Sequence, residues 1–172
     1  QAEHDPRARA IMVTTSESLA NAVSDEVERQ LKLLPRESIA RPAIENNSYI
    51  AVMDSVEDMF TVMNEVAPEH LEIQLPDPMS YMSLVQNAGS VFLGAYASEP
   101  LGDYLGGTNH VLPTSGTARF SSPLGVYDFV KRTSFTQFTK ERLEEVAAHI
   151  TTLARTEGLE AHARAIEVRF EK

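Results

Sequence analysis

Short apolar segments alternate with helix-periodic segments along the first 96 residues, and this alternation limits the fold more than any other feature of the chain. The apolar segments begin at Ala10, Ser48, His70 and Gly89. Strands that are apolar over nearly their whole length, with helices between them, are typical of a parallel sheet covered by helices. We therefore predict an α/β fold with a mostly parallel sheet, whose functional residues gather in loops at the carboxyl ends of the strands.

Three helices are predicted between these strands. Residues 16–35 repeat apolar side chains at intervals of three and four positions and end at a proline. Residues 55–68, which Asp54 can cap, and residues 77–87 form the second and third helical patterns. The stretch from 36 to 47 is polar and is interpreted as a connection, whereas residues 1–9 have helical spacing.

The character of the sequence changes after Tyr96. Residues 97–125 are rich in Gly, Ser, Thr and Pro, and a loop of this length is usually functional or disordered. A strand-like segment at 134–139 and two helical patterns between residues 140 and 170 follow. We expect residues 1–123 to form the α/β domain and residues 124–172 to form a small, mainly helical domain.

The composition narrows the possible functions. The chain has 25 acidic and 15 basic residues, so its net charge of −10 argues against the basic face that nucleic acids and anionic membranes require. It has no cysteine, so any metal must be held by nitrogen or oxygen donors, which favours zinc or manganese. No apolar run approaches the roughly 18 residues of a membrane span, and we expect a cytoplasmic protein.

Histidines are the main candidates for chemistry. His110 lies with Asp103 in a loop where glycines let the backbone approach a ligand closely, and we interpret this cluster as functional. His70 follows a helix at the entry to a strand, and this corner fits a simple turn and a functional role equally well. Gln1 and His4 are three positions apart, so they would share a helix face and suit one metal ion, although this spacing is also common by chance.

Two other histidines lie in helical patterns. His149 is interpreted as a surface or boundary residue of its helix, and the spacing of His162 from Glu157 alone favours an exposed helical side chain. The chain contains no dinucleotide-binding glycine motif, P-loop, HExxH motif or serine nucleophile elbow. The residues by themselves thus indicate an α/β metalloenzyme or a ligand-binding domain.

Taken together and in order, several motifs resemble the second half of histidinol dehydrogenases. They span residues 1–170 and read QAEHDPRARAIMVTT, APEHLEI, NAGSVFLG, LGDYLGGTNHVLPT, SSPLGVYDFVKR and EGLEAHARAIEVRF. Enzymes of this family are zinc-dependent homodimers that oxidise L-histidinol to L-histidine through the aldehyde, using NAD+ in both steps. They are considerably longer than this chain.

The resemblance implies a zinc site made of nitrogen and oxygen donors. Gln1 and His4 match the first two zinc ligands of the family, Asp103 matches the third and His162 the fourth. Amine and imidazole nitrogens are good zinc ligands, so the metal would hold and orient histidinol.

The resemblance also implies a catalytic pair. His70 would be the general base that removes the hydroxyl proton as hydride leaves for NAD+, and Glu69 would activate the water that adds to the aldehyde. An imidazole with a pKa near about 6.5 suits repeated proton transfers near neutral pH. The predicted substrate contacts are this pair together with Asp103, His110, Glu157 and His162.

The main NAD-contacting residues of the family lie upstream of Gln1, so we assign no cofactor-binding residue in this chain. The sheet is then the second half of an incomplete Rossmann-like domain, and a zinc ligand at a fraying chain end indicates a longer protein cut before Gln1. The tail from residue 124 is expected to pack on the partner subunit of a homodimer, where Glu157 and His162 complete the partner's active site.

Two other functions were weighed against this one. A non-catalytic zinc-binding or assembly module would keep the same motifs by descent. An unrelated zinc hydrolase would use Glu69 to activate water, but it does not explain the GTNHVLPT motif. We therefore predict a segment of histidinol dehydrogenase, inactive without the upstream half of the enzyme.

Overall fold

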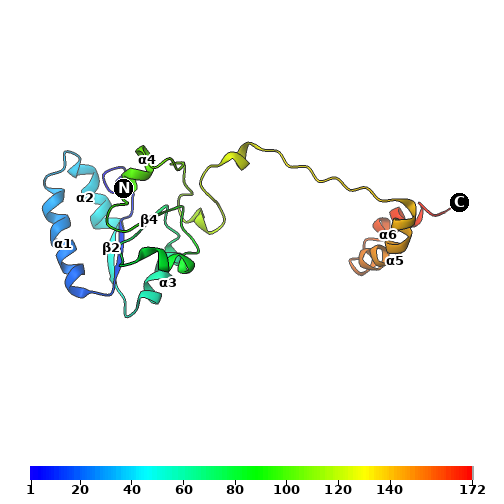
Figure 1. The fold of residues 1–172 in the computed structure, drawn as a ribbon, viewed down its shortest axis with the longest axis horizontal. Coiled ribbons are helices and arrows are strands. Elements are labelled where there is room, and N and C mark those ends of the chain that lie inside the picture. The colour runs from blue at the N-terminus through cyan, green and yellow to red at the C-terminus, as the bar shows by residue number, and fades with distance from the viewer. Residues whose placement is uncertain (172) are drawn as a thin grey trace. The chain divides into compact units, whose positions relative to one another are not determined.

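The computed structural model describes residues 1–171, which divide into unit 1, Gln1–Phe129, and unit 2, which begins at Val130 (Figure 1). The sequence analysis placed this boundary after Pro123, within unit 1 of the structure.

Unit 1 contains two pairs of parallel strands. β1 (Ile11–Thr14) pairs with β2 (Tyr49–Val52), and β3 (His70–Ile73) pairs with β4 (Ser90–Leu93). All four strands lie in the apolar segments that the sequence indicated. The predicted α/β class with parallel strands is therefore confirmed.

Helices connect these strands, and serine side chains start two of them. The connecting helices are α1 (Glu17–Leu31), α2 (Glu37–Asn47) and α3 (Val56–Val66). Ser16 caps α1 by accepting from the Leu19 N–H at 3.2 Å, and Ser55 caps α3 by accepting from the Asp58 N–H at 3.1 Å. The cap of α3 is thus the residue after Asp54, which the sequence analysis had favoured.

Helix α2 occupies a stretch that was predicted to be a connection. Pro42 lies inside it, and a proline in a helix removes one backbone donor. Tertiary contacts outweigh this cost, because the Ala40 and Ala43 side chains are almost wholly buried and Arg41 pairs with glutamates of α1 and α2. Burial and cross-helix pairing, not local propensity, explain this helix.

Three other local predictions differ from the structure. Residues 1–9 form turns and not a helix, with the His4 N–H donating to the Gln1 carbonyl at 3.0 Å. The third predicted helix is the 3₁₀ helix η1 (Pro78–Leu84). Residues 134–139 form neither a strand nor a helix, and the predicted long loop contains the short helix α4 (Glu99–Tyr104) and the 3₁₀ turns η2 (Thr117–Arg119) and η3 (Val126–Phe129).

The apolar core of unit 1 lies between α3 and the β3–β4 pair. Phe60 and Met63 of α3 pack with Ile73 of β3, and the Phe60 ring stacks on Tyr81 of η1 with centroids 5.8 Å apart. This cluster fixes the face of β3 that turns toward α3. The opposite face of the strand is left for the polar residues described below.

Unit 2 contains two helices, α5 (Lys140–Thr156) and α6 (Glu160–Glu167), as predicted. They contact each other, and Ala154 of α5 and Ala163 of α6 are buried. Gly158 adopts a positive φ of 74° between the helices, a conformation that glycine tolerates best. None of the helices between residues 1 and 171 has the length and apolarity that a membrane crossing requires.

Candidate catalytic and metal site

Strand β3 sorts its side chains into a core face and a polar face. Leu71 and Ile73 belong to the apolar cluster on α3, and successive residues of a strand project to opposite sides. His70 and Glu72 therefore share the polar face. The strand brings a histidine and a carboxylate to one surface without burying either in the core.

Gly89 permits the close packing beneath the first residues of this strand. Its N–H donates to the Pro68 carbonyl and the Ser90 N–H donates to the Glu69 carbonyl, both at 2.9 Å. A Cβ at position 89 would lie only 2.6 Å from the Glu69 carbonyl oxygen. The backbone of the predicted catalytic pair is thus held against β4 at a distance that only glycine allows.

A second glycine brings α4 against the sheet. Phe92 of β4 is buried, and a Cβ at Gly102 of α4 would lie 2.8 Å from its ring. The same ring lies 6.2 Å from the His70 ring, measured between centroids. The Phe92 ring thus lies close to both His70 and α4.

Both ring nitrogens of His70 face polar side chains. The Gln1 Nε2 atom lies 2.9 Å from Nδ1, and the Glu99 Oε1 atom lies 3.7 Å from Nε2. Nδ1 thus faces an amide group and Nε2 faces a carboxylate. The His70 side chain is only 10% exposed, which shields these contacts from bulk water.

Glu99 shares its surroundings with a second carboxylate. Burial raises the pKa of Glu99, and a hydrogen bond with Asp103 and the charge of Asp103 raise it further, while a positive charge on His70 acts in the opposite direction. The two residues are four positions apart on α4 and so lie on one face of it. Among residues 1–171, His70, Glu99 and Asp103 form a group whose ligand atoms lie within 4.8 Å of one another, as one metal ion requires.

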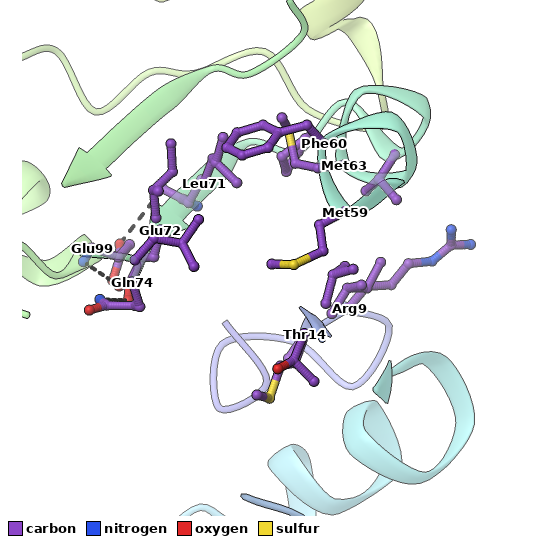
Figure 2. Close-up of a pocket in the computed structure, with 18 of the residues that line it drawn as sticks. Arg9, Thr14, Met59, Phe60, Met63, Leu71, Glu72, Gln74 and Glu99 are labelled. Atoms are coloured by element: carbon purple, nitrogen blue, oxygen red, sulfur yellow. Dashed lines mark hydrogen bonds and ion pairs between the residues drawn. The ribbon is translucent and has the colours of Figure 1, made fainter. Parts of the chain in front are cut away.

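A cavity of about 560 Å³ opens beside this group, lined by Gln1, His70 and Glu99 at its polar end. Its other walls are mainly apolar and come from α3, β1 and β3. Figure 2 shows Met59, Phe60 and Met63 of α3, with Arg9 and Thr14 from the β1 region, facing Leu71 and Glu72. An apolar cavity with a few convergent polar groups is the usual form of a small-molecule site.

The other predicted site residues of unit 1 are not members of the group formed by His70, Glu99 and Asp103. Glu69 directly precedes His70 and is partly buried, and its carbonyl is fixed by Ser90. His4 is exposed on the turn after Gln1 and is not a member of the three-residue group. His110 is exposed in the loop after α4.

The remaining two predicted residues belong to unit 2. Glu157 follows the last turn of α5, and His162 lies in α6; both side chains are exposed. The structure therefore brings together Gln1, His70 and Asp103 of the predicted set. The four-residue zinc site of Gln1, His4, Asp103 and His162 stays a prediction.

Glu99 and Glu72 were not singled out from the sequence. The spacing of Glu99 and Asp103 is a possible signal, because residues four apart share a face if the segment is helical. The glycine and the proline in SEPLGDY argue against a helix, since both residues disfavour helix interiors. Glu72 had the signal of strand alternation with His70, two positions before it.

Comparison with known proteins gives one consistent family. The family model described as histidinol dehydrogenase matches residues 1–170. The chain is 67% identical over 171 residues to histidinol dehydrogenase of Lactiplantibacillus plantarum and 60% identical over 172 residues to that of Streptococcus mutans. These matches cover 99% and 100% of the chain and 40% of each relative.

A solved structure agrees with the sequence comparisons. The chain superimposes on the crystal structure of histidinol dehydrogenase from Elizabethkingia anophelis with a TM-score of 0.83 at 39% identity. The match covers 98% of this chain and 39% of that one. The chain thus spans about two-fifths of the length of the proteins it matches.

Proposed function

This chain belongs to the histidinol dehydrogenase family, and we propose that it supplies the proton-transfer and metal-binding residues for oxidation of L-histidinol to L-histidine. The observation that carries the proposal is the placement of His70, which is nearly buried at the polar end of a cavity with Gln1 on one ring nitrogen and Glu99 facing the other. Such an arrangement suits a base that must accept and return protons in a shielded place.

His70 accepts the hydroxyl proton of the substrate on its imidazole ring, beside which the Gln1 side-chain amide lies, 2.9 Å from Nδ1. The imidazolium that results carries its second proton on Nε2, and the Glu99 carboxylate beside it stabilises that charge. A general base in this position typically contributes about 10²–10⁴ in rate. Glu69, the neighbouring carboxylate, removes a proton from the water that adds to the aldehyde before the second oxidation.

The donors around His70 suit a zinc ion. One imidazole and two carboxylates converge within 4.8 Å, the Gln1 amide adjoins them, and the chain contains no thiol. Zinc accepts nitrogen and oxygen donors of these kinds. We propose that Asp103 with Gln1 and His4, joined by His162 of the partner subunit, would hold the ion, which would supply a positive charge that orients the amine and imidazole nitrogens of the substrate.

The rest of the enzyme supplies what this chain lacks. We propose that NAD+, the hydride acceptor, is bound by the upstream part, and that Glu157 and His162 complete the site of the partner subunit in a cytoplasmic homodimer. Large apolar side chains that are exposed in this chain support the proposal that other protein surfaces cover them. Tyr96 is fully exposed and Phe135 is 92% exposed, which is unusual for residues that face only water.

The test compares the complete enzyme with its parts. The complete enzyme should form NADH from L-histidinol, the chain alone should not, and His70→Asn should lower kcat by at least 10²-fold because it removes the proton acceptor. Chelation should abolish turnover, and zinc should restore it. A matched control is His149→Asn, which changes an exposed histidine of α5 and should leave turnover unchanged.

Three results would contradict the proposal. Undiminished turnover of His70→Asn would exclude His70 as the base, and robust turnover by the isolated chain would exclude dependence on the upstream part. Loss of zinc binding without loss of turnover would show that the metal serves assembly and not catalysis.

A further inference from the structure

We propose that Glu72 is a positioning residue of this site: its carboxylate fixes the start of α4 on β3 and thereby sets the place of Glu99 and Asp103 relative to His70. This inference rests on the function proposed above. Glu72 is not among the metal ligands or the proton-transfer residues of that function, and acts through the helix.

Both oxygens of Glu72 are engaged on the polar face of β3. Oε1 accepts from the backbone N–H of Glu99 at 3.1 Å, and Oε2 accepts from the Gln74 side-chain amide at 3.0 Å (Figure 2). The first bond joins two elements that are 27 residues apart in the sequence. The second engages the other carboxylate oxygen and does not involve α4.

Helix α4 depends on such an anchor because it is short and lacks its own cap. It has only six residues, and Ser98 at its N-cap position makes no side-chain capping bond. A helix of this length is not stable by itself in water, and its first backbone N–H groups need external acceptors. A carboxylate at a helix start is also favourable because that end of the helix dipole is positive.

The anchor and the catalytic histidine belong to the same rigid element. Glu72 and His70 are two positions apart on one face of β3, and Glu99 meets both of them. Its N–H is held by Glu72, and its carboxylate faces the His70 ring. Three positions after Glu99 in α4, Gly102 packs on Phe92. Without Glu72, the helix would keep the packing contact and lose the bond at its start.

The experiment compares three variants of the complete enzyme. Glu72→Ala should reduce zinc affinity and kcat about 10- to 100-fold, the usual cost of losing a group that orients metal ligands. Glu72→Gln should stay within about 3-fold of wild type, because its amide oxygen can still accept from the Glu99 N–H. Gln74→Ala is the matched control, since it removes the other partner of Glu72 and leaves the bond to α4.

Zinc affinity is measured by competition with a chelator, and kcat and KM are measured separately with L-histidinol. Circular dichroism and thermal unfolding show whether each variant is folded, and the near-isosteric glutamine keeps the test decisive if alanine disrupts folding. The proposal is overturned if Glu72→Ala keeps wild-type zinc affinity and kcat, or if Glu72→Gln or Gln74→Ala is as damaged as Glu72→Ala. If wild-type enzyme forms no NADH, the proposed function fails, while zinc affinity still tests the placement of Asp103.

Discussion

Substituting Gly89 by alanine should impair catalysis more than it impairs folding. The added Cβ would lie 2.6 Å from the Glu69 carbonyl oxygen and 3.0 Å from the Pro113 ring. Ordinary van der Waals contact begins at 3.4 Å, so the backbone before His70 must move away from β4 by roughly 0.4–0.8 Å. Neither neighbour is the flexible end of a side chain, and the strain cannot be relieved by a rotamer change.

The size of this displacement sets the expected effect. Overpacking of a tight contact typically costs about 1–3 kcal/mol of stability. A displacement near 1 Å of a catalytic group can reduce the rate about 10²-fold, so we expect kcat to fall about 10- to 100-fold. The change moves the hydrogen-bonded pairs Pro68–Gly89 and Glu69–Ser90, which fix the start of β3.

The assay is NADH formation by the complete enzyme with saturating L-histidinol, accompanied by thermal unfolding. Gly125→Ala is the matched control, because a Cβ there would meet no atom closer than 3.9 Å. The reasoning is refuted if Gly89→Ala keeps at least half of the wild-type kcat while it is folded. It is also refuted if Gly125→Ala loses as much activity as Gly89→Ala.

Two further predictions concern hydrogen bonds that hold elements around the site. Asn64→Ala should lower the free energy of unfolding by about 1–3 kcal/mol, because the Asn64 side chain accepts hydrogen bonds from the Gln86 and Asn87 N–H groups. Denaturant titration of the complete enzyme measures this free energy. An unchanged unfolding midpoint would contradict the prediction. Hydrogen bonding to Arg41 lowers the pKa of Glu28 to about 2, so this contribution to stability is present above the ordinary pKa and is lost as pH falls toward 2. Arg41→Leu should therefore speed hydrogen exchange in α1 and α2 a few-fold near neutral pH, with a smaller difference from wild type below pH of about 4. A difference that does not change with pH would exclude the ion pairs as its cause.

The sequence was sufficient for the four strands of unit 1, but it also predicted a strand at 134–139 that the structure does not form, and it missed a helix. Apolar runs located β1 to β4 because buried parallel strands leave a continuous hydrophobic signal. Helix α2 carries no such signal: Pro42 argues against it, and Ala40 and Ala43 become informative only when they are seen buried. The local sequence pattern predicts a helix or strand whose formation depends on its own residues. It fails for a helix or strand whose formation depends on packing against neighbouring elements.

The candidate site shows the same division. Motif resemblance selected His70 and Asp103, which the structure brings into one group, because family motifs record residue identity at fixed places in a chain. Glu99 was missed because its role depends on α4, whose six residues include a proline and a glycine. Helix α4 contacts Glu72 of β3 and Phe92 of β4. The bond to Glu72 joins residues that are far apart in the sequence, so a local pattern does not reveal it.

Gly89 and Gly102 explain how the site reaches its dimensions. Neither has a positive φ in the structure, in contrast to Gly94 or Gly107, so their use is not conformational freedom. Each instead removes a side chain where a second element must approach, the Glu69 backbone in one case and the Phe92 ring in the other. Gly89 and Gly102 therefore set how closely β4 and α4 approach His70. Replacing either glycine by a larger residue should move His70 away from the Glu99 and Asp103 carboxylates, although no polar residue is changed.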